Sequence, residues 1–265
     1  MRFSIIASAL VAALVGFGGT LAIVVEATRH LGATPDQTTS WVVALCVGMG
    51  VTSAWLSLRY RMPIVTAWSL AGAVLIIATP AGTTLGDAVA AAIFTGGLTV
   101  LAGSVPALGA LLGRLPASIA GGMLAGLLLR FAIGLFVGAQ TAPALVLPLI
   151  ALFLLARLLH PASAPLIVIA LALPLAWLEG YALAGFLLAL PSILVAAVAG
   201  IALIGPLTGA LASALHCEDE RFPAVIAFVV TASNISLLGV GGAFWGLLTG
   251  VAALGLDRLA QRRSP

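Results

Sequence analysis

One stretch decides the fold of this chain: Arg59-Tyr60-Arg61-Met62-Pro63-Ile64-Val65-Thr66-Ala67-Trp68-Ser69-Leu70-Ala71-Gly72. Two arginines end an apolar segment, and Pro63 opens the next one, which reaches only to residue 79 before Pro80 interrupts it. A helix needs about 17 residues to cross the hydrocarbon core of a membrane, so this segment is at the lower limit. It nevertheless carries Thr66, Trp68 and Ser69 close to its start. A short, interrupted span with polar residues near its break is typical of the binding site of a transporter.

The composition around this stretch is that of a helical membrane protein. Hydrophobic residues make up 62% of the 265 positions and charged residues 7%, whereas a soluble domain carries roughly 25% charged residues. The apolar runs are much longer than the ~10-residue alternating segments of a membrane β-barrel, which favours an all-α, polytopic fold. The stretches between them are too short for a soluble catalytic or nucleic-acid-binding domain. We therefore expect no enzyme activity, no cofactor and no nucleic-acid partner.

The apolar runs predict ten membrane spans and their orientation. The spans are expected at residues 4–26, 37–58, 63–79, 85–112, 116–138, 143–159, 163–178, 182–213, 222–238 and 242–256, with Pro191 dividing the eighth. With the N-terminus in the cytoplasm, only Arg29 faces outward over the first seven spans. The arginines that face the cytoplasm are then Arg2, Arg59, Arg61, Arg114 and Arg157. Because positive residues concentrate on the cytoplasmic side, both termini are predicted to be cytoplasmic.

The polar residues of the short span suit an anionic ligand. Thr66 and Ser69 offer hydroxyl groups near a helix that would begin at Pro63, where free N–H groups and the helix dipole favour a carboxylate. Trp68 would provide a flat apolar wall for a ring. The alternative is an interfacial tryptophan anchor beside two hydroxyl groups that bond to their own helix.

A glycine cluster in the first span is a second candidate. It lies in Val15-Gly16-Phe17-Gly18-Gly19-Thr20. Three glycines within four residues allow either a helix break that lines a substrate cavity, with Phe17, Gly18 and Thr20 as lining residues, or close packing of a neighbouring helix.

Several charged groups lie in or beside the predicted spans. Arg130 is deep in the fifth span, where a charge is costly, so it has either a gating or charge role or a structural partner. Glu26 and Glu179 are at outer span ends, as solvated caps or as outer proton sites. His216-Cys217-Glu218-Asp219-Glu220 has the residue types of a metal site, but adjacent residues cannot all turn to one ion. We interpret this segment as a solvated acidic loop and expect no metal site.

Glycines at four-residue spacing mark faces for close helix contacts. They are Gly122 with Gly126, and Gly242 with Gly246 and Gly250. The contacts could form within one chain or between chains of a homo-oligomer.

Several motifs resemble a known transporter family. They are Gly16-Phe17-Gly18-Gly19-Thr20, Gly48-Met49-Gly50-Val51-Thr52-Ser53, Arg59-Tyr60-Arg61-Met62-Pro63 with Thr66-Ala67-Trp68-Ser69, Leu127-Leu128-Leu129-Arg130-Phe131 and Gly242-Ala243-Phe244-Trp245-Gly246. In this order they resemble the benzoate/proton symporter (BenE-type) family. The resemblance implies a proton-coupled secondary transporter of benzoate or a related aromatic carboxylate in the bacterial inner membrane.

The resemblance also implies a fold of two inverted seven-span repeats. Residues 1–178 resemble the complete first repeat, with core spans 1–4 and gate spans 5–7, and residues 179–265 resemble the last three spans of the second. About four spans of the family pattern are missing at this junction. In the leading interpretation Thr66, Ser69 and the helix start at Pro63 hold the carboxylate, and Trp68 and Phe17 hold the ring. The alternative is a non-transporting, internally deleted membrane protein or accessory subunit.

Overall fold

The structure is a computed structural model, and the residues that it describes are helical. It describes residues 21, 23–80, 82–159, 164, 167, 168, 170–172, 174, 192–237 and 239–261. Within these residues the only β-pairing is an isolated bridge between Leu237 and Val240. The described part of the chain therefore confirms the predicted helical class. Phe17, Gly18, Thr20 and Glu179 lie outside the described residues.

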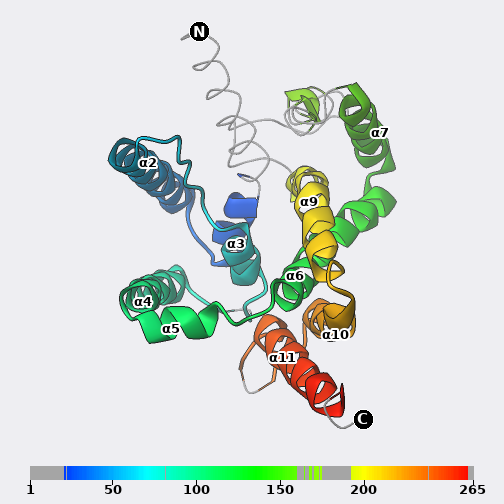
Figure 1. Cartoon of the computed structure of the whole chain (residues 1–265). Coiled ribbons are helices and arrows are strands. Elements are labelled where there is room, and N and C mark those ends of the chain that lie inside the picture. The colour runs from blue at the N-terminus through cyan, green and yellow to red at the C-terminus, as the bar shows by residue number, and fades with distance from the viewer. Residues whose placement is uncertain are drawn as a thin grey trace. The chain divides into compact units, whose positions relative to one another are not determined.

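The helices follow one another along the chain as Figure 1 shows. They are α2 (Pro35–Tyr60), α3 (Leu70–Ile77), α4 (Leu85–Ser104), α5 (Pro106–Leu112), α6 (Ala117–Thr141), α7 (Pro143–Leu159), α9 (Ser192–Ala214), the 3₁₀ turn η1 (Glu218–Glu220), α10 (Arg221–Ala232) and α11 (Gly242–Gln261). Four described helical segments are long and apolar enough to cross a membrane: Pro35–Tyr60, Leu85–Ser104, Ala117–Thr141 and Ala197–Ala214. The total of ten spans and the seven-plus-seven repeat stay predictions.

Local sequence signals explain where α2 begins and ends. Thr34 is the N-cap, because its hydroxyl accepts a hydrogen bond from the Gln37 N–H at 3.3 Å, while the Gln37 side chain accepts from the Thr34 N–H at 2.9 Å. Pro35 occupies the first helical position, where its missing N–H is not needed. The helix ends where Arg61 adopts a left-handed conformation with φ of 54°. This turn directs the chain back along α2 through residues 63–69.

Three predicted spans are not continuous helices, and in each a residue disrupts helical bonding. The span 63–79 contains a helix only from Leu70. The span 85–112 is two helices, because Pro106 forces the preceding residue, Val105, into an extended conformation. The span 222–238 stops being helical at residue 232, since Asn234 turns left-handed with φ of 54°. In contrast, α7 has the predicted bounds, and α9 begins directly after Pro191 as predicted.

The chain divides into two compact units. One comprises residues 1–77 and 133–202, and the other comprises residues 78–132 and 203–265. The first holds α2 and α3, and the second holds α10 and α11. The division of the sequence into repeats at residue 178 stays a prediction.

Glycines allow α6, α10 and α11 to pack closely against one another in the second unit. A Cβ atom on Gly122 would lie 2.2 Å from the backbone oxygen of Ala224, and one on Gly126 would lie 2.6 Å from that of Phe228. A Cβ on Gly246 would lie 2.0 Å from the hydroxyl oxygen of Thr231. The glycine faces therefore make contacts within the chain, which is one of the two arrangements that the sequence left open.

A small apolar cluster fills the same interface. Ile119 of α6 and Ala227 of α10 are fully buried, and Leu254 of α11 is packed with them. The buried hydroxyl of Thr231 has no hydrogen-bond partner among the described residues and fills the space that a side chain at position 246 would need. Close backbone approach of this kind is how helices associate where lipid removes the hydrophobic driving force.

Candidate functional site

The candidate site is built around residues 63–69, which form neither a helix nor a strand and lie against α2. The Ser57 hydroxyl both accepts a hydrogen bond from the Ile64 N–H and donates one to the Ile64 carbonyl, each at 3.0 Å. The Ser53 hydroxyl accepts from the Thr66 N–H at 2.9 Å. Side chains of a helix thus replace the neighbouring strand that an extended segment normally requires.

The pairing works because the spacing of the two serines along α2 nearly equals the spacing of their two partner residues along the segment. Ser53 and Ser57 are four residues apart, a rise of about 6 Å along a helix. Ile64 and Thr66 are two residues apart, about 6.6 Å along an extended chain. Since Ser57 pairs with Ile64 and Ser53 with Thr66, the segment runs antiparallel to α2. Its register on the helix is fixed by these two serines.

Thr66 is the most extensively bonded residue of the segment. Its hydroxyl oxygen lies 2.7 Å from the Thr52 hydroxyl, 2.8 Å from the Ser53 hydroxyl and 3.1 Å from the Met49 carbonyl oxygen. The side chain is half-buried against α2. Thr66 therefore fastens the extended segment to the helix.

Ser69 begins α3. Its hydroxyl oxygen accepts a hydrogen bond from the Gly72 N–H at 3.0 Å, and its carbonyl accepts from the Ala73 N–H at 3.0 Å. This is the geometry of an N-cap. The helix start that the sequence placed at Pro63 is thus at Leu70, because Thr66 directs its polar groups to α2 and only the Ser69 side chain is placed to bond to the next turn.

Several groups at the start of α3 are available for a ligand. Neither the Leu70 N–H nor the Ala71 N–H has a partner in the described part of the chain. The Ser69 oxygen accepts from Gly72, and no described group accepts its O–H hydrogen. Two N–H groups and one O–H group at the positive end of a helix form a small set of donors that suits a carboxylate.

The other residues predicted for the site differ in burial and in location. Pro63 is exposed at the start of the segment, and Trp68 is half-buried within it. Arg130 is exposed on α6, and no acidic side chain pairs with it among the described residues. Its gating or charge role stays a prediction, as do the roles of Phe17, Gly18 and Thr20.

Sequence reasoning missed the α2 serines as members of the site. Met49, Ser53 and Ser57 recur every four residues, so they share one face of a helix, and all three are half-buried. The signal available in the sequence was two serines four residues apart on one face of a predicted membrane span. Such residues in a membrane helix need a partner, and here the partner is the backbone of the next segment.

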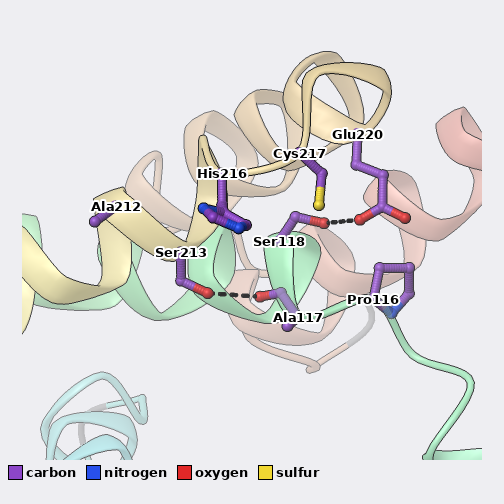
Figure 2. A pocket seen from close by; sticks show the side chains of 8 residues that line it. All are labelled: Pro116, Ala117, Ser118, Ala212, Ser213, His216, Cys217 and Glu220. Carbon is purple, nitrogen blue, oxygen red and sulfur yellow. Dashed lines mark hydrogen bonds between the residues drawn. The ribbon is translucent and has the colours of Figure 1, made fainter.

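The second unit contains a separate pocket of about 470 Å³ at the start of α6 and the end of α9 (Figure 2). The residues that line it are Pro116, Ala117, Ser118, Ala212, Ser213, His216, Cys217 and Glu220. Most of the polar groups are already paired. Ser118 donates a hydrogen bond to the Glu220 carboxylate, and Ser213 donates one to the Ala117 carbonyl at 3.3 Å.

The prediction of a solvated acidic loop over residues 216–220 is wrong for Glu220. Its side chain is only 20% exposed, and its carboxylate also lies 3.5 Å from the Arg258 guanidinium of α11. The predicted solvated loop therefore holds one acidic residue that connects three helices, whereas Glu218 and Asp219 are exposed. No described group of three histidine, cysteine or acidic side chains could hold a metal ion.

Comparison with known proteins places this arrangement in a family. The family model "Benzoate membrane transport protein" matches residues 1–182 and 175–256. An inner membrane protein of Escherichia coli, YdcO, is 28% identical over 372 aligned positions, which cover 95% of each chain. A benzoate membrane transport protein of Acinetobacter baylyi is 34% identical over 150 positions, which cover 57% of this chain and 38% of that one. No solved structure matches this chain significantly.

Proposed function

Because this chain belongs to the benzoate membrane transport protein family, it is a membrane transporter, and we propose that it carries benzoate or a related aromatic carboxylate together with protons. The substrate class is supported by the similarity to the Acinetobacter benzoate membrane transport protein and by the donors at the start of α3. We further propose that the protein resides in the inner membrane, as YdcO does, with both termini in the cytoplasm.

The observation that carries this proposal is the non-helical backbone of residues 63–69. Within lipid every backbone N–H and C=O must be bonded, and non-helical backbone is tolerated only where protein covers it or where it lines a water-filled cavity. The backbone groups of Ile64 and Thr66 reach α2, but those of Val65 and Ala67 have no partner in the described part of the chain. A path for water and substrate along this edge satisfies them.

The roles of the site residues follow from their bonds. Ser69 and the first N–H groups of α3 would bind the carboxylate, Thr66 would hold the segment in place, and Trp68 would contribute to the wall beside the ring. Phe17, Gly18 and Thr20 would line the same path from the first span, and Pro63 would mark its entrance.

Uptake of labelled benzoate tests the proposal directly. The purified protein, reconstituted in liposomes, should accumulate benzoate when the outside is more acidic than the inside, and a protonophore should abolish the accumulation. Uptake that ignores the pH difference would refute the proton coupling. Liposomes that take up no more benzoate than protein-free liposomes would refute the substrate.

A pair of Ser69 variants separates ligand binding from helix capping. Ser69→Asp keeps a good N-cap, so the thermal midpoint should change little. However, its negative charge occupies the place of the substrate carboxylate, and uptake should fall at least tenfold. Ser69→Thr keeps both the cap and the hydroxyl donor and should retain most of the uptake. Equal uptake by the two variants would exclude Ser69 from the binding site.

A difference in length from YdcO motivates a second proposal, an internal deletion. The alignment with YdcO has 372 positions, whereas this chain has 265 residues, so at least 107 positions, the difference, have no counterpart here. We infer that spans of the second repeat are absent. The alternative to transport is that, without these spans, the chain acts as a non-transporting membrane subunit. A protein that is stably folded in the membrane but inactive in the liposome assay would favour that alternative.

A further inference from the structure

We propose that Val65 and Ala67 determine which ring substituents the substrate can carry. This inference rests on the proposed function, since it concerns the same site. It adds ring contacts from these two residues to those that are proposed for Trp68 and Phe17.

The exposure of the extended segment alternates with a period of two. Ile64, Thr66 and Trp68 are half-buried, whereas Val65 and Ala67 are exposed. Val65 is 83% exposed, more than any other large hydrophobic residue in the described part of the chain. Successive side chains of an extended chain point to opposite faces, so the segment has one face on α2 and one face turned away from it.

The register cannot slip to exchange the two faces. A shift by one residue would bring Val65 and Ala67 onto α2 and remove the hydrogen bonds of Ser53 and Thr66. The four bonds that join Ile64 and Thr66 to the two serines therefore also fix the exposed positions of Val65 and Ala67.

The exposed face continues directly to the carboxylate donors. Ser69 is two residues beyond Ala67 and is exposed like it, so Val65, Ala67 and Ser69 form one row. Neighbours in such a row are about 7 Å apart. A carboxylate bound at Ser69 and the first turn of α3 has the body of that helix on one side, so its ring extends along the row over Ala67.

The sizes of the two side chains then set the substrate range. The methyl group of Ala67 leaves room for a planar ring, and a larger side chain would occupy the place of the ring. Val65 lies one step further from the carboxylate, where a para substituent would reach. One buried methyl group or its removal changes discrimination by about 10-fold or somewhat more.

Competition with substituted benzoates tests the inference. Inhibition of labelled benzoate uptake would be measured with benzoate and with 4-alkylbenzoates of increasing size. Ala67→Leu should raise the KM for benzoate at least tenfold. Val65→Ala should improve inhibition by a large 4-alkylbenzoate several-fold relative to benzoate, and Val65→Phe should weaken it.

The control is Thr66→Val, which keeps the shape of the side chain but loses its hydroxyl bonds. It should lower uptake of all substrates by the same factor, because it loosens the whole segment. Both exposed positions bear no hydrogen bonds in the described structure, so Val65→Ala should retain the wild-type thermal midpoint.

Two outcomes distinguish the inference from the proposed function. If wild-type protein transports benzoate but the ratio of inhibition constants in Val65→Ala and Ala67→Leu stays within twofold of wild type, the inference is overturned. Absence of benzoate uptake by the wild-type protein overturns the proposed function, together with the assignment of a ring to this face.

Discussion

Gly122→Ala is expected to push α6 away from α10 and to lower the thermal midpoint of the protein by a few degrees, up to roughly 8 °C. The new Cβ atom would lie 2.2 Å from the Ala224 backbone oxygen and 3.0 Å from its carbonyl carbon. A side chain could rotate away, but a backbone carbonyl moves only with its helix. Overpacking costs about 1–3 kcal/mol and sometimes more, which exceeds the ~1 kcal/mol that alanine gains over glycine in a helix.

Gly134→Ala is the matched control, because it makes the same change in the same helix. Among the described residues, no atom outside the adjoining backbone of α6 lies within 4 Å of a Cβ atom at position 134, so this variant should keep or raise the thermal midpoint. The measurement is the loss of the monodisperse peak in detergent after heating. Equal midpoints for the two variants would show that α6 and α10 do not approach as closely as the structure has them.

Ser53→Ala is expected to lower benzoate uptake at least tenfold while leaving most of the fold intact. Ser53 accepts the Thr66 N–H and lies 2.8 Å from the Thr66 hydroxyl. Its loss leaves a backbone N–H without a partner, which costs about 1–3 kcal/mol, and each 1.4 kcal/mol is a factor of ten. The extended segment would no longer be held in one position, so Ser69 and the start of α3 would lose their fixed place.

Ser40→Ala removes a serine from the same helix without touching the segment. The Ser40 hydroxyl has no partner among the described residues, and its removal should leave uptake at the wild-type rate. Ser57→Ala should behave like Ser53→Ala, since Ser57 bonds to both backbone groups of Ile64. If all three variants transport equally well, the two serines have no role in placing the site.

Part of the candidate site was readable in the sequence. Thr66 and Ser69 stood out because hydroxyl groups near a break in an apolar span need partners. Their separate roles were not readable, since the same residues can cap a helix, bind a ligand or bond to another helix. The choice depends on Ser53 and Ser57, which are nine to sixteen positions away and become neighbours of the segment only when the chain turns back at Arg61.

The sequence by itself determined the helical membrane class and the bounds of α7, because hydrophobic run length and prolines act over a few neighbouring positions. It also showed glycine faces, but not their partners. Only the tertiary structure decided that Gly122 meets Ala224, that α3 begins at Leu70 and that Val65 and Ala67 face away from α2. Each of these depends on which part of the chain lies beside the residue, because a hydrogen bond or a close contact forms only when both partners are in place.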